Sequence, residues 1–166
     1  NAHHGPSGAR NVWINLSKGE YIAFLDSDDL FEKNKLEYQI QRMKENDVGF
    51  SHTSYYRVKK NGEIIVPVHS GRFSGNIYPE IYETCPIATP TVIVKKDLLK
   101  DVQFNEDVDY AEDILLWSKL AKRSRCLGID LPLSKVRLHG KNALLQTDAQ
   151  IKGLTNIINY GVLVDD

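Results

Sequence analysis

Short apolar runs with polar borders alternate along the chain with stretches in which apolar residues recur at helical spacing. The clearest apolar run is Tyr21–Leu25, which ends abruptly in the acidic stretch Asp26–Asp29. Such a run predicts a strand that is buried on both faces, as in a parallel sheet covered by helices. Open α/β folds place their ligands at the carboxyl end of such a strand. The acidic stretch is therefore the first candidate for a functional site.

Helical spacing predicts a first helix over residues 9–16, with Ser7 or Gly8 as its N-cap. Its expected apolar side consists of Val12, Trp13 and Leu16. Further helices are expected over residues 30–46, 110–123 and 143–158. The helix over residues 30–46 has an expected apolar face made of Leu36, Ile40 and Met43.

Strands are expected between these helices, and one turn signal is strong. Asn61-Gly62 predicts a type I′ hairpin that joins a strand over residues 48–58 to one over residues 63–68. Shorter strands are expected over residues 91–94, 126–129 and 135–139. The order of helices and strands predicts an α/β fold with an antiparallel hairpin.

The composition excludes several classes of protein. The chain has 166 residues, 42% of them hydrophobic and 26% charged, which suits one domain with a sizeable core. A net charge of −1 gives no electrostatic reason to expect a nucleic-acid partner. No apolar segment approaches the roughly 20 residues of a membrane span, and no secretory signal is present, so we expect a cytoplasmic location. Cys85 and Cys126 lack metal-ligand spacing and fit buried thiols in a reducing compartment.

The acidic stretch has two interpretations. Crowded carboxylates repel one another, and a divalent cation with oxygen ligands relieves that repulsion. Asp26, Asp28 and Asp29 are then a metal site that holds a phosphorylated substrate. The alternative is a polar turn, because Asp and Ser favour turns and helix N-caps.

Three other groups of polar residues carry similar alternatives. Glu112-Asp113 begins a predicted helix, where acids interact well with the helix dipole, but a carboxylate in a pocket can also be a general base. His139 of the segment Arg137-x-His139 is either structural or a metal ligand. Arg10 follows a Gly-containing loop, so it either binds a pyrophosphate or pairs with a surface acid.

Three segments together resemble the family 2 glycosyltransferases with a GT-A fold. Ala9-Arg10-Asn11, followed by residues 18–29, resembles the central signature of that family. Residues 104–117 are similar to its acceptor-side segment with a Glu-Asp pair, and Arg137-Leu138-His139 resembles the Arg-x-His that often follows. The segments occur in the family's order and cover most of residues 5–142. The resemblance implies a partial GT-A fold, a mixed and mostly parallel sheet flanked by helices.

The resemblance also implies roles on the donor side of a site. Asp26 and Asp28 match the Asp-x-Asp that holds Mn²⁺ or Mg²⁺ and the sugar nucleotide, and Asp29 is expected beside the donor sugar. Arg10 is expected to face the nucleotide, and His139 the metal or the diphosphate.

On the acceptor side, Asp113 matches the general base and Glu112 is expected to support acceptor or donor binding. The implied function is a metal-dependent, inverting transfer of a sugar from a nucleotide diphosphate sugar, UDP-linked, to a glycan or lipid-linked acceptor. One carboxylate base and a metal-held carboxylate pair suffice for such a direct displacement. Two alternatives remain: a fragment that only binds a partner or glycan, and a nucleotidyltransferase.

The resemblance also bears on the domain. The family's GT-A domain begins with a strand–helix–strand unit, and nothing in residues 1–166 matches that unit. We therefore expect a single GT-A domain that is truncated at its amino end, with Asn1-Ala2 as an extraneous leader. An exposed central strand is a template for pairing, so a homodimer is expected. A lipid-linked acceptor would place the protein at the periphery of a membrane.

Overall fold

The structure is a computed structural model that describes residues 5–138 and 147–162. Its α-helices are α1 (Gly5–Leu16), α2 (Lys35–Glu45), α3 (Glu112–Arg123) and α4 (Thr147–Asn156), the last followed by a π-helical stretch, Ile157–Val162. Three 3₁₀ turns are η1 (Glu80–Tyr82), η2 (Thr89–Thr91) and η3 (Lys96–Leu99). The strands are β1 (Tyr21–Ala23), β2 (Leu30–Phe31), β3 (Phe50–Val58), β4 (Ile64–Val68), β5 (Ile93–Lys95) and β6 (Cys126–Arg137).

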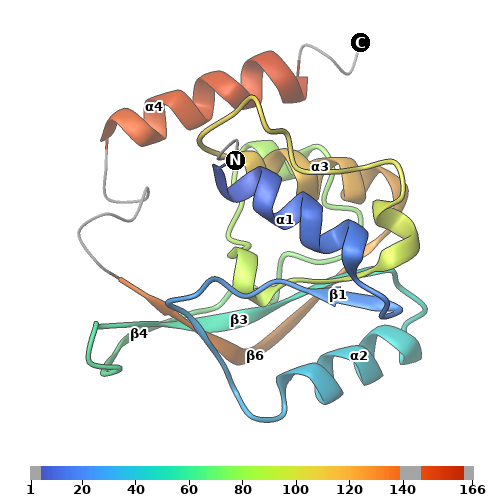
Figure 1. Cartoon of the computed structure of the whole chain (residues 1–166). Helices are drawn as coiled ribbons and strands as arrows, with labels where there is room; N and C mark the ends of the chain where they lie inside the picture. Colours follow the sequence, from blue (N-terminus) through green and yellow to red (C-terminus); the bar gives the residue numbers. More distant parts are fainter. Residues whose placement is uncertain (1–4, 139–146, 163–166) are drawn as a thin grey trace.

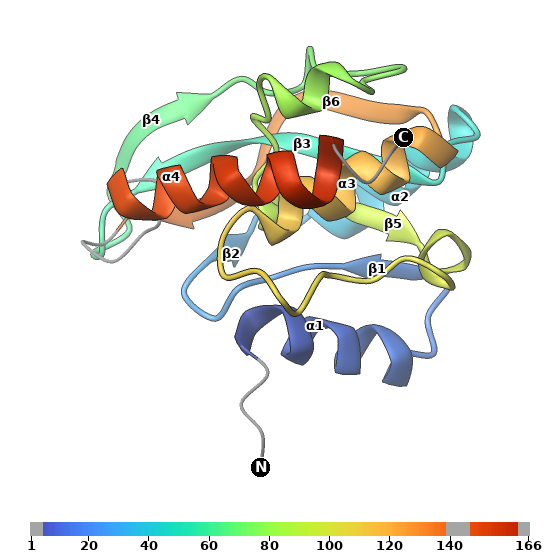
Figure 2. The ribbon, with the colours of Figure 1, turned by 90° about the horizontal axis from the view of Figure 1, so that it is seen from above.

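The strands form one mixed sheet in the order β1-β5-β3-β6-β2, with β4 paired to β3. Figure 1 shows α1, α3 and α4 on one side of this sheet and α2 on the other. Seen from above, α1 lies at one end of the molecule beside β1 (Figure 2). The α/β class and the mixed sheet are confirmed. The described strands are not mostly parallel, however: only β3 and β6 pair in parallel, because β5 runs antiparallel between β1 and β3.

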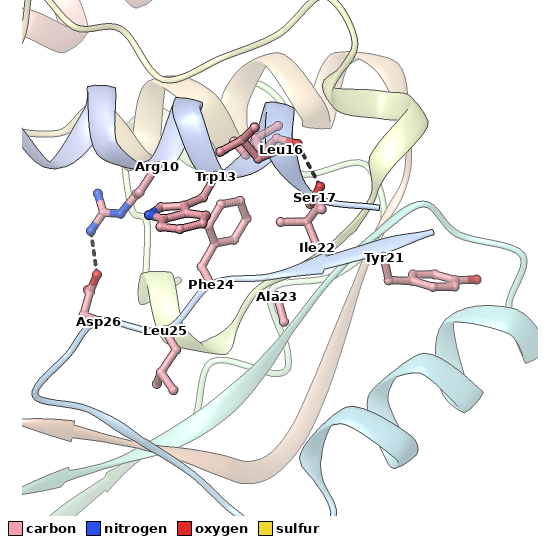
Figure 3. Close-up of a pocket in the computed structure, with 11 residues that line it drawn as sticks. Arg10, Trp13, Leu16, Ser17, Tyr21, Ile22, Ala23, Phe24, Leu25 and Asp26 are labelled. Carbon is pink, nitrogen blue, oxygen red and sulfur yellow. Dashed lines mark hydrogen bonds and ion pairs between the residues drawn. The ribbon is translucent and has the colours of Figure 1, made fainter. Parts of the chain in front are cut away.

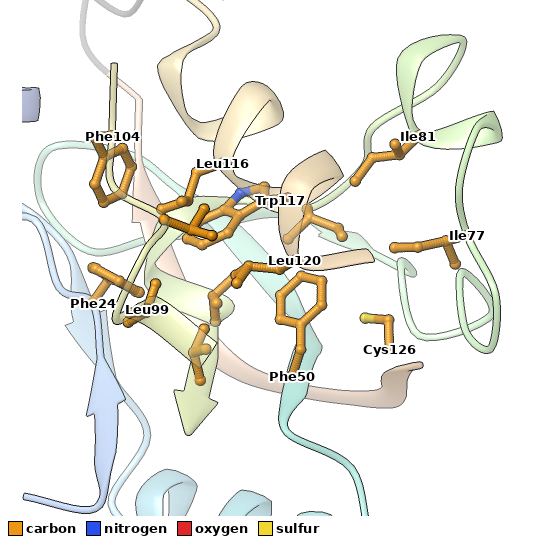
Figure 4. Close-up of a cluster of buried hydrophobic side chains, with 14 of the residues drawn as sticks. Phe24, Phe50, Ile77, Ile81, Leu99, Phe104, Leu116, Trp117, Leu120 and Cys126 are labelled. Atoms are coloured by element: carbon orange, nitrogen blue, oxygen red, sulfur yellow. The ribbon is translucent and has the colours of Figure 1, made fainter. Parts of the chain in front are cut away.

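The core lies between the sheet and α3, and its centre is Trp117 (Figure 4). This side chain is fully buried and packs against the rings of Phe24, Phe50 and Phe104 at centroid distances of 5.5–5.9 Å. Aromatic pairs in such edge and stacked arrangements add to the stabilisation that burial alone provides. The cluster therefore fixes α3 relative to β1 and β3.

Helix α1 packs through a different face from the expected one. Val12, Trp13 and Leu16 are 52%, 70% and 62% exposed, so they form no part of the core. The helix begins at Gly5, which places Ser7 and Gly8 inside its first turns and not at a cap. Its buried positions are Ser7, Gly8, Asn11 and Ile14.

The reason for this orientation is Asn11. Its amide donates to the carbonyl oxygen of Phe104 and accepts from the Phe104 N–H, both at 2.9 Å. It also donates to the carboxylate of Glu106 at 2.9 Å. A buried amide needs such partners, and meeting that need turns the apolar side of α1 outward.

Strand β1 is shorter and more exposed than predicted. It spans three residues and forms the end of the sheet, with β5 as its only neighbour among the described strands. Of the apolar run Tyr21–Leu25, Phe24 is buried and Leu25 is 50% exposed. The prediction of a strand covered on both faces is therefore wrong for this structure.

The segment after the acidic stretch also differs from the prediction. Leu30 and Phe31 form β2, which pairs with β6, and the helix begins only at Lys35. On α2 the polar side chains Lys35 and Gln39 are fully buried beside Met43, whereas Leu36 is 44% exposed. Met43 and Ile40 of the expected apolar face do pack in a small hydrophobic cluster, and the buried Lys35 and Gln39 bind Thr91 and Ser51 beside it.

The other predicted elements are largely confirmed. Asn61-Gly62 lies in the turn that joins β3 and β4 in an antiparallel hairpin, as predicted. The type I′ turn is wrong, however, because it needs a positive φ at both central residues and, of this pair, only Gly62 has one, at 89°. Helix α3 forms where it was expected. The two strands expected over 126–129 and 135–139 are one continuous strand, β6. Cys85 and Cys126 are free thiols.

Within the described ranges, no helix is both long and apolar enough to cross a bilayer.

Candidate active site

Arg10 joins the two acidic segments of the chain. Its guanidinium donates to Asp26 at 2.8 Å and to Glu112 at 2.9 Å, and it lies 5.3 Å from the centre of the Phe104 ring. Figure 3 shows the Arg10–Asp26 pair at the mouth of the space between α1 and β1. Burial disfavours the charged guanidinium, but the two carboxylates outweigh it and raise the pKa of Arg10 above its ordinary value. Arg10 is thus a permanent cation between the predicted donor and acceptor sides.

The acidic stretch is a tight turn fastened to the end of β6. The Asp29 N–H donates to the Asp26 carbonyl oxygen at 3.1 Å. The buried Asp29 carboxylate accepts from the Arg137 N–H, and the Arg137 side chain donates to the Asp28 carbonyl oxygen, both at 2.8 Å. The structure therefore brings Arg137 to the acidic turn. His139 lies outside the described residues.

Burial also changes the ionisation of Asp29. It raises the pKa of this carboxyl to about 6, and the neighbouring charges of Asp28 and Asp26 act in the same direction. The Arg137 N–H and the charge of the Arg137 guanidinium oppose the rise. The expected crowding of carboxylates at the sheet edge is present.

Glu112 and Asp113 begin α3, as the sequence indicates. Ala111, the residue before the helix, has a left-handed backbone with φ 63°, a conformation that costs a non-glycine residue about 1 kcal/mol or more. One Asp113 oxygen accepts from the Ile114 N–H at 2.8 Å, and the other accepts from the Thr89 hydroxyl at 3.3 Å. The Asp113 carboxylate is therefore hydrogen-bonded both by its own helix and by η2.

The pKa of Asp113 is raised to about 6. Burial of the carboxyl is the largest cause, followed by the negative charge of Glu112. The Ile114 N–H, the Arg10 charge and the Thr89 hydroxyl lower the pKa and limit the rise. A carboxylate with this pKa is mostly ionised at neutral pH and is a better proton acceptor than an ordinary Asp.

The core connects the two sides of the site. Trp117 lies one helical turn after Asp113 on α3, and its ring packs against Phe24, two residues before Asp26. Close-packed aromatic contacts of this kind leave little room for movement. The acidic turn and Asp113 are thus supported by the same buried cluster.

The described residues offer a limited set of metal ligands. Within them, no group of three or more His, Cys, Asp and Glu side chains is arranged to hold a metal ion. Mg²⁺ sites often use only one or two carboxylates and take their other oxygens from substrate phosphates and water. Asp26 and Asp28 have the oxygen donors for such a site, although Arg10 already binds one Asp26 oxygen. The donor chemistry fits Mn²⁺ or Mg²⁺ together with a diphosphate.

A hollow of about 540 Å³ runs from the Arg10–Asp26 pair along α1 and β1 (Figure 3). One side is the outward apolar face of α1, with Trp13 and Leu16, and the other is β1 with the residues that follow it. Strand β1 has a single neighbour in the described sheet. A groove bordered by a strand edge suits an added strand.

Sequence reasoning missed Thr89 and the polar pair of α2. Thr89 lies in a segment that showed no regular pattern, so no signal pointed to its contact with Asp113. Lys35 and Gln39 look like ordinary exposed positions of an amphipathic helix, and only the packing shows that they are buried.

Comparison with known proteins identifies the family of the chain. The model of the family described as Glycosyl transferase family 2 matches residues 1–102. An uncharacterized glycosyltransferase of Rickettsia conorii is 46% identical over 159 residues, which are 95% of this chain and 26% of that protein. WfgD of Escherichia coli, a UDP-Glc:alpha-D-GlcNAc-diphosphoundecaprenol beta-1,3-glucosyltransferase, is 32% identical over 139 residues, which are 81% of this chain and 52% of that protein. The chain thus spans between a quarter and about half of these relatives.

A solved structure shows the same fold. The crystal structure of Staphylococcus aureus TarS 1–349 in complex with UDP superimposes with a TM-score of 0.64 at 24% identity, covering 95% of this chain and 46% of that one. The described sheet and helices therefore form part of a GT-A fold, as expected. Because the family model covers more than half of the residues, the chain belongs to glycosyltransferase family 2.

Proposed function

We propose that this chain carries the catalytic face of a metal-dependent, inverting glycosyltransferase. The observation that carries the proposal is the position of Arg10, which joins Asp26 of the acidic turn to Glu112 beside Asp113. Arg10 thereby brings together residues 16 and 102 positions away in the sequence, which supports assigning them to one site. Glycosyl transfer needs charge neutralisation on the donor side and a base on the acceptor side. We assign the first to Arg10 and the acidic turn and the second to Asp113.

The reaction is a direct displacement at the anomeric carbon of the donor sugar. The acceptor hydroxyl oxygen forms the new bond to that carbon, and the bond from the carbon to the diphosphate oxygen breaks. The diphosphate leaves with the bonding electron pair, and the hydroxyl proton passes to Asp113. A single displacement inverts the anomeric configuration, so only one base is needed.

The roles of the other residues follow from their positions. Asp26 and Asp28 would hold Mn²⁺ or Mg²⁺, which when bound supplies positive charge to the leaving diphosphate. Arg10 contributes its own positive charge to the site and orients Asp26 and Glu112. Asp29 supports the turn through its bond to the Arg137 N–H, and we propose that it lies beside the donor sugar.

The substrate class is inferred from the relatives. WfgD is named as an enzyme that uses UDP-Glc and a diphosphoundecaprenol acceptor, and TarS has been crystallised with UDP and with UDP-GlcNAc. For this chain we propose a UDP-linked donor and a glycan or lipid-linked acceptor. A lipid-linked acceptor would bring the protein to a membrane surface.

The test begins with binding and proceeds to turnover. UDP is titrated into the chain by calorimetry, first with Mn²⁺ and then with EDTA. UDP release from UDP-glucose and from UDP-GlcNAc is then measured for the chain and for a full-length relative. We expect metal-dependent binding, and Asp113→Asn should lower UDP release at least 100-fold while UDP binding is retained. Asp97→Asn is the control, because Asp97 is exposed and pairs with Lys100.

Other results would reject specific parts of this proposal. Full activity in Asp113→Asn would remove Asp113 from the role of base. Release of pyrophosphate would favour the nucleotidyltransferase alternative, and UDP binding without any turnover would favour the binding module. A product with a retained anomeric configuration, read by NMR, would exclude the single displacement.

A further inference from the structure

The turn formed by residues 88–91 is held by hydrogen bonds from two other elements, α2 and β6. It contains η2 and connects the irregular segment after Cys85 to β5. Within the turn, the Ala88 carbonyl oxygen accepts from the Thr91 N–H at 2.9 Å and from the Thr91 hydroxyl at 2.6 Å. The Thr89 carbonyl oxygen accepts from the Val92 N–H at 3.2 Å. The carbonyl groups of Ala88 and Thr89 thus have hydrogen-bond donors within or next to the turn.

The other two carbonyl groups of the turn are bound by buried side chains from distant elements. The Ser134 hydroxyl on β6 donates to the Pro90 carbonyl oxygen at 2.7 Å. The Thr91 carbonyl oxygen accepts from Lys35 at 3.1 Å and from Gln39 at 3.0 Å, both on α2.

Gln39 in turn donates to the Ser51 hydroxyl on β3 at 2.9 Å and accepts from Lys35. Lys35, Gln39, Ser51 and Ser134 all have 0% exposure. Burying this many polar groups is favourable only when each has a partner, so the network determines one position for the turn.

We propose that Thr89 is a positioning residue for Asp113, and that the buried network on α2, β3 and β6 exists to hold Thr89 in place. This inference rests on the proposed role of Asp113 as base. Thr89 is itself 7% exposed, and its hydroxyl donates to the Asp113 oxygen that is not bound by the Ile114 N–H. The carboxylate is therefore oriented from two sides, which fixes the direction of its lone pairs toward an acceptor hydroxyl.

The other charged and titratable groups around Asp113 are identified by position. Glu112 is on the same helix as Asp113, and Arg10 on α1 acts on Asp113 through its charge. The Cys85 thiol, in the segment before η2, lies within the electrostatic influence of Asp113. Arg10 and Glu112 remain in place when Thr89 is changed, because their contact involves neither residue 89 nor the turn. The Thr89 hydroxyl can therefore be varied with the remaining charges constant.

The experiment is an NMR titration of the Asp113 side-chain carboxyl carbon in the wild type, Thr89→Val and Thr89→Ser, with Asp113→Asn for assignment. Valine keeps the shape of threonine but removes the donor, so we expect the pKa of Asp113 to rise by about one pH unit. Serine keeps the hydroxyl and should restore the wild-type pKa to within about 0.3 of a unit. A Thr89 hydroxyl that does not donate to Asp113 would give the same pKa in all three proteins.

An unchanged pKa in Thr89→Val, or an equal rise in Thr89→Ser, would overturn the proposal. The titration needs no substrate, so it is independent of the turnover assay. Absence of UDP release from every UDP-sugar by the wild type would count against the proposed function and not against the contact between Thr89 and Asp113. A rise in the pKa of Asp113 with unchanged turnover at every pH would show that the contact exists but does not serve the base, which would also overturn the proposal.

Discussion

At the scale of single residues, Arg10 links two acidic segments that are far apart in the sequence. It pairs with carboxylates from two segments, and its guanidinium lies over the Phe104 ring. Both pairs are partly shielded from solvent, with 18% exposure of the Arg10 side chain, so they are screened less than surface pairs. Lysine could not replace this contact, because one ammonium group lacks the planar fork that reaches two carboxylates.

We predict that Arg10→Ala lowers the free energy of unfolding by about 1–3 kcal/mol, because it leaves Asp26 and Glu112 without their shared cation. Chemical denaturation at neutral pH measures the change. Arg42→Ala is the matched control: Arg42 pairs with Glu45 on the exposed side of α2, so its loss should change stability by less than about 0.5 kcal/mol. Equal effects of the two variants would contradict the bridging role of Arg10.

At the scale of elements, α2 is anchored by polar side chains as well as by Met43. Lys35 is fully buried between α2 and η2, and burial lowers its pKa to about 7 from an ordinary value of 10.5. Between these two pH values the unfolded chain holds a proton that the folded chain has released. The unfolded state then binds more protons, so the free energy of unfolding rises with pH across this interval.

We predict that Lys35→Met removes this rise. In the wild type the contribution of Lys35 should increase by at most about 1.4 kcal/mol per pH unit from about pH 7 toward pH 10. Comparing denaturant unfolding of the wild type and Lys35→Met over this range measures it. Lys119→Met, at an exposed position of α3, should retain the pH dependence of the wild type. A constant difference in stability between wild type and Lys35→Met at every pH would show that Lys35 does not change its charge on folding.

At the scale of the whole molecule, the main unexplained surface is the groove between α1 and β1. Its apolar side chains include Trp13, which is 70% exposed, and its other border is a strand with one neighbour in the described sheet. An exposed strand edge beside an apolar face is a template for pairing. The homodimer expected from the sequence therefore stays a prediction, with this groove as its proposed interface.

We predict reversible self-association in sedimentation equilibrium, weakened at least tenfold by Trp13→Gln, because the indole would be buried at the interface. Ile65→Gln serves as the control, since Ile65 is also exposed but lies on β4. A single monomeric species at all concentrations would refute the dimer. Equal weakening by both variants would assign the interface to another surface.

The sequence by itself determined the elements with strong local signals and the types of residue in the site. Asn61-Gly62 predicted its hairpin because turn geometry is local. The Glu-Asp pair was correctly placed at the start of α3 because helical periodicity is local too. The acidic turn and Arg10 were recognised through their similarity to a family, and the structure places them in contact.

Only the tertiary structure decided which faces are buried and which distant residues meet. Asn11 rotates α1 so that its apolar side faces outward, and the network around Lys35 adds a buried polar contact to the apolar face of α2. The contact between Thr89 and Asp113 joins residues 24 positions apart. Such outcomes depend on satisfying buried polar groups across several elements at once. Local periodicity carries no information about partners that lie far away along the chain.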